Sequence, residues 1–228
     1  MYALTPPQVA RLPQASRRAA SLVSILAAVA LAGCSSEGGV PFEELVRDGE
    51  RFLTPETLEP YSGIAFATFQ GQPGIVQRRS RLRNGAYDGP FEAFFVNQKL
   101  SSKEVYADGV LNGPYEWYFE SGSLFEEGTY KNGLLEGPYR AYWENGDLYE
   151  EGSYRAGQFD GPRRWFTENR MIEMVTYRDG IIEGLYERYL EDGTLDLKGM
   201  LYQGQPCGTW IEGPSEIHYP SCGIRVTE

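Results

Sequence analysis

The chain has 228 residues, of which 41% are hydrophobic and 23% charged, and its formal net charge is −11 at pH 7. This acidic balance disfavours binding to nucleic acid and to anionic lipid head groups, because both need a basic surface. The single histidine, His218, leaves no material for a zinc-type cluster or for a Ser-His-Asp or Cys-His catalytic set. We therefore expect no enzyme: the sequence predicts no catalytic residues, no bound metal and no cofactor.

Residues 1–33 have the pattern of a secretory signal peptide. Three arginines (Arg11, Arg17 and Arg18) give a positive start, and Ala19–Ala32 is a mostly apolar run of 14 residues. This run is too short to span a bilayer but has the length of a signal-peptide core. Cleavage after residue 33 would remove the three arginines and no acid, so it would lower the net charge from −11 to −14.

The apolar run ends in Leu31-Ala32-Gly33-Cys34, which resembles a bacterial lipobox. The resemblance implies a lipoprotein in which the Cys34 thiol carries an acyl chain such as palmitate and the cysteine becomes the new N-terminus. Ser35 follows in place of the aspartate that is associated with inner-membrane retention in such lipoproteins. The implied location is the cell envelope at the periplasmic face of the outer membrane, with the lipid bilayer as a partner through Cys34. The alternative is an ordinary secreted protein with a cysteine near its cleavage site.

Residues 34–57 are predicted to form a lipidated tether and an N-terminal cap. Ser35 to Val40 is small and polar, which is typical of a flexible linker. Phe42 to Leu53 places a few apolar residues among charges, a pattern that predicts a weak amphipathic helix at most.

Residues 58–208 contain two columns of glycines that repeat about every 24 residues. The neighbours repeat as well: Leu124-Phe-Glu-Glu-Gly-Thr-Tyr returns as Leu148-Tyr-Glu-Glu-Gly-Ser-Tyr. A fixed period of this size indicates an array of similar supersecondary units. The columns are Gly63, Gly89, Gly113, Gly137, Gly161, Gly184 and Gly208, and Gly85, Gly109, Gly133, Gly157, Gly180 and Gly204.

Each unit is predicted to be a β-hairpin. A run rich in aromatic residues, such as Tyr115 to Glu120, suits a strand. A dipeptide such as Asn145-Gly146 then predicts a two-residue turn in which both residues have positive φ. A second strand such as Leu148 to Tyr154 follows, and a wider turn through Lys131-Asn132-Gly133 or its equivalents leads to the next hairpin.

The period of two along a strand separates two faces of the predicted sheet. Tyr115, Trp117 and Phe119 point to one face, which is almost wholly aromatic. Glu116 and Tyr118 point to the other face, where charges of both signs flank a central aromatic column. Stacking of aromatic residues from successive units would build a core that no single unit could supply.

The order Gly-Pro-Tyr-x-x-Tyr, Asn-Gly-x-Leu, Glu-Gly-x-Tyr and x-Asn-Gly resembles the MORN-repeat-variant family. The resemblance is best over 109–160, whereas 163–183 departs from the pattern and is one residue shorter. It implies an all-β fold: an elongated, twisted, antiparallel, single-layer sheet of tandem hairpin repeats of about 24 residues. Bacterial members are often labelled lipoproteins or antitoxins, and eukaryotic MORN proteins are linked to membranes and scaffolding.

Residues 209–228 are predicted to form a C-terminal cap that covers the last open sheet edge. Cys207 and Cys222 are 15 residues apart in a chain that is expected to be exported. In an oxidising compartment such a pair is predicted to form a disulfide.

The leading functional interpretation is a membrane-anchored repeat lipoprotein that binds or scaffolds a protein of the cell envelope. Tyrosines beside acids are the expected binding residues, because tyrosine is a common interface anchor. An acidic chain favours a cationic or neutral partner and not nucleic acid. The candidate binding residues are Glu116, Tyr118, Tyr142 and Glu144.

Two other functions remain open. An antitoxin or immunity-type protein would neutralise one partner, with its acidic surface masking a basic toxin or imitating a nucleic acid. A carboxylate-based hydrolase would use acids that recur at one position in four units, although a solvated strand end or a weak calcium site also accounts for them. These acids are Glu120, Glu144, Glu168 and Glu191.

Overall fold

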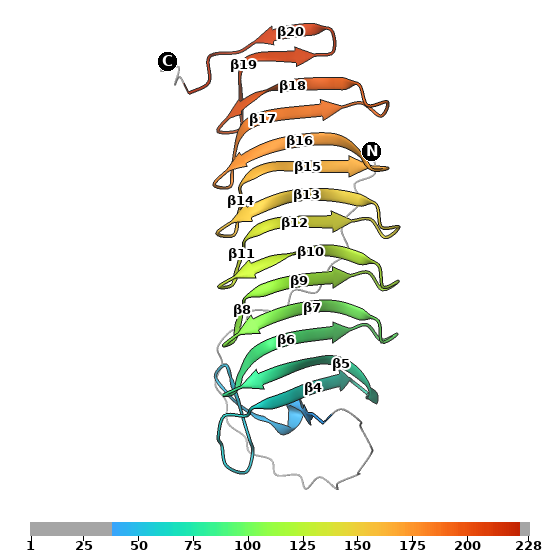
Figure 1. Cartoon of the computed structure of the whole chain (residues 1–228), viewed down its shortest axis with the longest axis vertical. Helices are drawn as coiled ribbons and strands as arrows, with labels where there is room; N and C mark the ends of the chain where they lie inside the picture. Colours follow the sequence, from blue (N-terminus) through green and yellow to red (C-terminus); the bar gives the residue numbers. More distant parts are fainter. Residues whose placement is uncertain (1–37, 224–228) are drawn as a thin grey trace. The chain divides into compact units, whose positions relative to one another are not determined.

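The computed structural model describes residues 38–223. These residues form one sheet of 18 strands, together with a separate two-stranded sheet made of β2 and β3. From β4 (Gly63–Phe69) onward, each long strand pairs with the long strands before and after it in the chain, and each two-residue strand pairs with the strand before it. The hairpins therefore follow one another in a single row (Figure 1). Within residues 38–223 the only parallel pairing is that of β1 (Val40–Pro41) with β4. The predicted fold class, an all-β single-layer sheet of tandem hairpins, is confirmed.

The N-terminal segment contains β1 (Val40–Pro41), the 3-10 helix η1 (Phe42–Glu44), β2 (Val46–Asp48) and β3 (Arg51–Leu53). The hairpin strands follow: β4 (Gly63–Phe69), β5 (Gln72–Arg83), β6 (Ala86–Phe94), β7 (Leu100–Ala107), β8 (Val110–Leu111), β9 (Gly113–Tyr118), β10 (Leu124–Lys131), β11 (Leu134–Leu135), β12 (Gly137–Tyr142), β13 (Leu148–Arg155), β14 (Gln158–Phe159), β15 (Gly161–Thr167), β16 (Arg170–Arg178), β17 (Ile181–Tyr189), β18 (Leu195–Tyr202), β19 (Gln205–Glu212) and β20 (Ser215–His218).

Two kinds of turn join these strands at the predicted positions, but the prediction assigned the two-residue turn and the wider turn the wrong way round. The turn at Asn132-Gly133 contains two residues that both have positive φ, 51° and 80°, as a type I′ turn requires. At Asn145-Gly146 only the glycine has positive φ, 91°, and Trp143 and Asp147 close a three-residue loop. An Asn-Gly pair fits both geometries, because the three-residue loop also needs one residue in the left-handed region.

The shortened unit over 163–183 has a different loop from its neighbours. Thr167 pairs directly with Arg170, which leaves only Glu168 and Asn169 in the turn. Both of these residues have positive φ, 48° and 60°. Loss of one residue has therefore replaced a three-residue loop by a two-residue turn while the strands on either side keep their pairing.

The aromatic face of the sheet is defined by the buried rings of Phe91, Tyr115, Tyr139 and Trp210. Tyr115 on β9 lies directly opposite Gly128 on β10, and a Cβ at Gly128 would meet the ring at 2.7 Å. Tyr139 on β12 lies in the same way over Gly152 on β13. The glycine of the repeated Glu-Glu-Gly therefore makes room for a ring to lie flat on the sheet, which buries apolar surface without a second layer.

The N-terminal cap packs on the aromatic face of the first hairpins. Phe42, Leu45 and Phe52 form a buried cluster with Ala65 and Leu82 of the sheet. The expected helix over Phe42 to Leu53 was wrong, because this segment forms η1 and the short hairpin β2–β3. A left-handed turn residue, Gly49 with φ 59°, reverses the chain and stops any helix.

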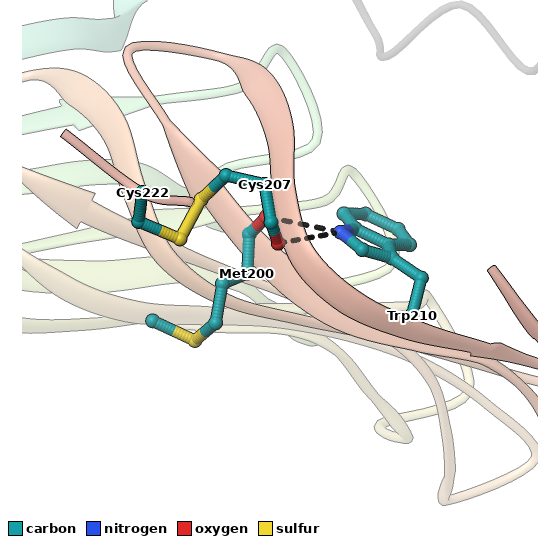
Figure 2. Close-up of a disulfide and its surroundings, with 4 residues drawn as sticks. All are labelled: Met200, Cys207, Trp210 and Cys222. Atoms are coloured by element: carbon teal, nitrogen blue, oxygen red, sulfur yellow. Dashed lines mark hydrogen bonds between the residues drawn. A yellow bond between two sulfur atoms is a disulfide. The ribbon is translucent and has the colours of Figure 1, made fainter. Parts of the chain in front are cut away.

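The C-terminal end is held by a disulfide and a tryptophan (Figure 2). Cys207 on β19 is bonded to Cys222, and β20 pairs with β19 as the last strand of the sheet. The Trp210 indole Nε1 donates to the carbonyl oxygens of Met200 and Cys207, both at 3.1 Å. The predicted boundary between array and cap at residue 208 lies inside β19, because the hairpin pattern continues through this strand.

Candidate functional site

The charged face, on the opposite side of the sheet from the aromatic face, carries a row of charges that we call the charge ladder. Each member lies directly opposite the next one on the neighbouring strand. The signs mostly alternate, so most neighbours attract each other. The ladder consists of Arg79, Glu92, Lys103, Glu116, Glu127, Arg140, Glu151, Arg164, Glu187 and Lys198, and the uncharged Met174 interrupts it between Arg164 and Glu187.

Ion pairs connect the ladder along most of its length. The Lys198 ammonium lies 2.8 Å from Glu187, and the Arg164 guanidinium lies 3.2 Å from Glu151. Arg140 lies between two acids, 3.8 Å from Glu151 and 3.8 Å from Glu127. The hydrogen bond from Lys198 lowers the pKa of the Glu187 carboxyl, so this acid is ionised at neutral pH. The predicted mixed-sign face is thus an ordered array of paired charges.

The alternation fails at the step from Glu116 to Glu127, the only like-charge neighbours of the ladder within residues 38–223. Glu116 is 3.6 Å from the Lys103 ammonium on its other side, and Glu127 shares Arg140 with Glu151. Both acid side chains are more than one-third exposed, at 38% and 37%. Like charges directly opposite each other in a sheet are destabilising. This step therefore places two carboxylates side by side, each with a cation on its far side.

Two tyrosines hold the carboxylates of this acid pair. The Tyr118 hydroxyl donates to Glu116 on its own strand, and the Tyr142 hydroxyl donates to Glu127 Oε1 at 2.8 Å. Partial burial, the hydrogen bond to Glu116 and the nearby acids raise the pKa of Tyr118 to about 12. Burial and Glu127 likewise raise the pKa of Tyr142. Both phenols are therefore protonated donors at neutral pH, and they fix the direction of the two carboxylates.

A shallow hollow of about 310 Å³ lies beside the acid pair. Two prolines that begin equivalent strands, Pro114 and Pro138, line it together with Thr129 and the two acids of the pair. The acids are consequently accessible from solvent along one side.

The structure brings three of the four predicted binding residues to one place. Glu116 belongs to the acid pair, and Tyr118 and Tyr142 donate hydrogen bonds to the pair, whereas Glu144 lies in the exposed loop after β12. The Tyr142 hydroxyl donates to Glu127 on the neighbouring strand and not to Glu144. The sequence analysis missed Glu127. The sequence pattern that indicates Glu127 is the pair of consecutive acids in Glu-Glu-Gly, because successive residues of a strand point to opposite faces of the sheet and one carboxylate therefore lies on each face.

The other acid of each Glu-Glu-Gly lies on the aromatic face. The Tyr115 hydroxyl donates to Glu126 Oε1 at 2.7 Å, and Glu150, only 6% exposed, pairs with Arg163. Burial raises the pKa of the Glu126 carboxyl, with a smaller contribution from the nearby charge of Glu150. These carboxylates are engaged by packed partners, so they belong to the core of the repeat array.

The remaining candidates are dispersed. Cys34 and the predicted signal peptide lie outside the described residues. The recurring acids Glu120, Glu144, Glu168 and Glu191 lie in separate exposed loops. Within residues 38–223, no three His, Cys, Asp or Glu side chains gather as a metal site would require. The described part of the chain contains no helix long and apolar enough to cross a membrane.

Comparison with known proteins agrees with the geometry of the hairpins. Residues 111–132 and 135–156 match the family model of the MORN repeat variant. The chain carries MORN repeats of the variant type. These two repeats contain β9, β10, β12, β13 and the acid pair, so the candidate site lies on recognised MORN repeats. No curated protein matches the chain. MORN repeats favour a repeat-based protein-binding module.

Proposed function

We propose that this protein is a lipid-anchored MORN-repeat module that binds another protein of the cell envelope through the charged face. The observation that carries the proposal is the acid pair Glu116 and Glu127, which is oriented by two tyrosines and accessible beside a hollow. A lysine or arginine from a partner would lie between the two carboxylates and be attracted by both. The tyrosine rings would then pack against the apolar part of that side chain.

The charge of the whole chain supports a cationic partner. The sequence carries 32 acidic and 21 basic residues, so long-range attraction would favour a positively charged surface. The aromatic face already supplies the core, and the charged face is free to bind without unfolding the repeats. The Leu31-Ala32-Gly33-Cys34 sequence supports an anchor at Cys34, which would keep the charged face near the membrane.

The test compares two double variants of the full chain that change the net charge equally. Glu116→Gln with Glu127→Gln neutralises the acid pair, whereas Glu120→Gln with Glu144→Gln neutralises two exposed loop acids of the same repeats. Each variant is expressed in the native envelope, cross-linked and recovered, and the partner is quantified by mass spectrometry. We expect partner recovery to fall at least several-fold for the first variant and to be retained by the second.

Thermal unfolding of both variants provides the control for folding. We expect the acid-pair variant to be as stable as the wild type, because relief of the like-charge contact offsets the lost hydrogen bonds. Equal loss of the partner in both variants would mean that only net charge matters. Full retention of the partner in the acid-pair variant would refute the proposed site.

A further inference from the structure

A second cavity lies away from the acid pair, between the N-terminal cap and the first hairpins. Its volume is about 770 Å³, within the range typical of small-molecule sites. Aromatic rings from both sides line it: Phe42 and Phe52 from the cap, and Tyr87 and Tyr106 from the sheet. The ring centroids of Phe52 and Tyr87 are 5.6 Å apart, and those of Tyr87 and Tyr106 are 5.3 Å apart. The cavity is therefore lined by a continuous aromatic cluster.

One cation in this cavity is incompletely paired. Arg78 on β5 lines the cavity, and its buried Nε has no hydrogen-bond partner among the described residues. The guanidinium carbon lies 5.4 Å from the centre of the Phe42 ring. An arginine cannot lose its charge in a protein, and a buried donor without a partner is costly. A ligand that accepts from Arg78 would remove this cost.

The other charges at the cavity define the ligand further. Arg47 also lines it, with its guanidinium carbon 5.8 Å from the Phe52 ring centre, and two exposed acids, Glu43 and Glu50, complete the charged lining. Within residues 38–223 neither Arg47 nor Arg78 forms a salt bridge with these acids. Two cations opposed by two acids favour a head group with a single negative charge over a doubly charged phosphate.

We propose that this cavity binds a small amphipathic carboxylate, with its head group at Arg78 and its apolar body among the four rings. A carboxylate matches the planar donors of a guanidinium, and the rings offer an apolar surface for a hydrocarbon chain. The cavity is formed by the cap and by β4 to β7, so this site is independent of the acid pair on the charged face.

Calorimetric titration of the full chain with octanoate and with octanamide tests the proposal. The two probes share their hydrocarbon chain and differ in the charge of the head group. We expect octanoate to bind about ten-fold or more tightly than octanamide, since a hydrogen bond to a charged group is the stronger kind. Amide NMR signals of residues 42–52, 66–68, 78, 87 and 106–109 should shift with octanoate.

A matched pair of variants locates the head group. Arg78→Gln should lower octanoate affinity to the level of octanamide, whereas Arg81→Gln, at an exposed position on the same strand and outside the cavity, should leave it unchanged. Octanoate that does not bind the wild type, or binds no better than octanamide, would overturn the proposal. So would equal weakening by both variants. If Arg78→Gln does not fold, the comparison of octanoate with octanamide on the wild-type protein still tests whether the cavity prefers a carboxylate.

Discussion

The contact between Tyr115 and Gly128 offers a strict test of how the repeats build their core. In Gly128→Ala the new Cβ would lie 2.7 Å from Tyr115 Cε1 and 2.9 Å from its hydroxyl oxygen. The ring is only 1% exposed, and it packs against Trp117 and Tyr130 with both centroids 5.0 Å away. These two neighbouring rings oppose a shift of the Tyr115 ring. Overpacking of this kind costs about 1–3 kcal/mol.

A shift of the ring would also be costly. The Tyr115 hydroxyl donates to Glu126 at 2.7 Å, and breaking a hydrogen bond to a charged group costs about 1.5–3 kcal/mol. Either route therefore destabilises the Gly128→Ala variant by at least about 1 kcal/mol, which lowers Tm by about 2–4 °C in a domain of this size.

Urea unfolding followed by circular dichroism measures the difference. Gly74→Ala is the matched control, because Gly74 is an exposed strand glycine without positive φ, and a Cβ added there would meet no atom within 4 Å. We expect Gly74→Ala to unfold at the wild-type urea concentration. If Gly128→Ala has the same midpoint as this control, the ring does not lie on the glycine and the packing argument is wrong.

Three further predictions concern the turns, the buried acid and the anchor. Gly146→Val should lower the urea midpoint more than Glu144→Ala. Gly146 has φ 91°, where a β-branched residue is strained, whereas the Glu144 side chain is exposed. Equal midpoints for the two variants would contradict the loop geometry. Glu126→Gln should stabilise the protein at neutral pH and keep the bond from Tyr115. Burial raises the pKa of Glu126 in the folded protein, so at pH values above that pKa the buried carboxylate is ionised and lowers the free energy of unfolding. The stability advantage of the Gln variant should therefore shrink as the pH falls through the folded pKa. A stability difference between the two proteins that does not change with pH would refute this. Cys34→Ser should move the protein from the membrane to the soluble fraction, and unchanged membrane association would refute the anchor.

The repeat architecture could be predicted because its signals are local. Glycines at a fixed spacing indicate turns, and alternation along a strand such as β9 indicates which side chains share a face. The turn at Asn145-Gly146 was misassigned because two loop geometries accept the same dipeptide. The sequence does not show whether both residues of such a pair must adopt positive φ.

The acid pair could not be predicted because it depends on pairing between strands. Glu116 and Glu127 are 11 residues apart, and only the register of β9 with β10 places them opposite each other. The cavity at Arg78 depends on even more distant contacts, since the cap must fold back on the sheet to form it. The short strands of that cap are stabilised by packing and carry little signal of their own.

The most direct measurement for the proposed function is photo-cross-linking in intact cells from single positions on each face. A photoreactive phenylalanine analogue replaces Tyr118 on the charged face in one strain and Tyr154, beside Tyr139 on the aromatic face, in another. If the acid pair is the docking site, position 118 should give an adduct whose partner peptide contains a lysine or arginine. Position 154 should give no adduct. An adduct from position 154 alone would contradict binding through the charged face.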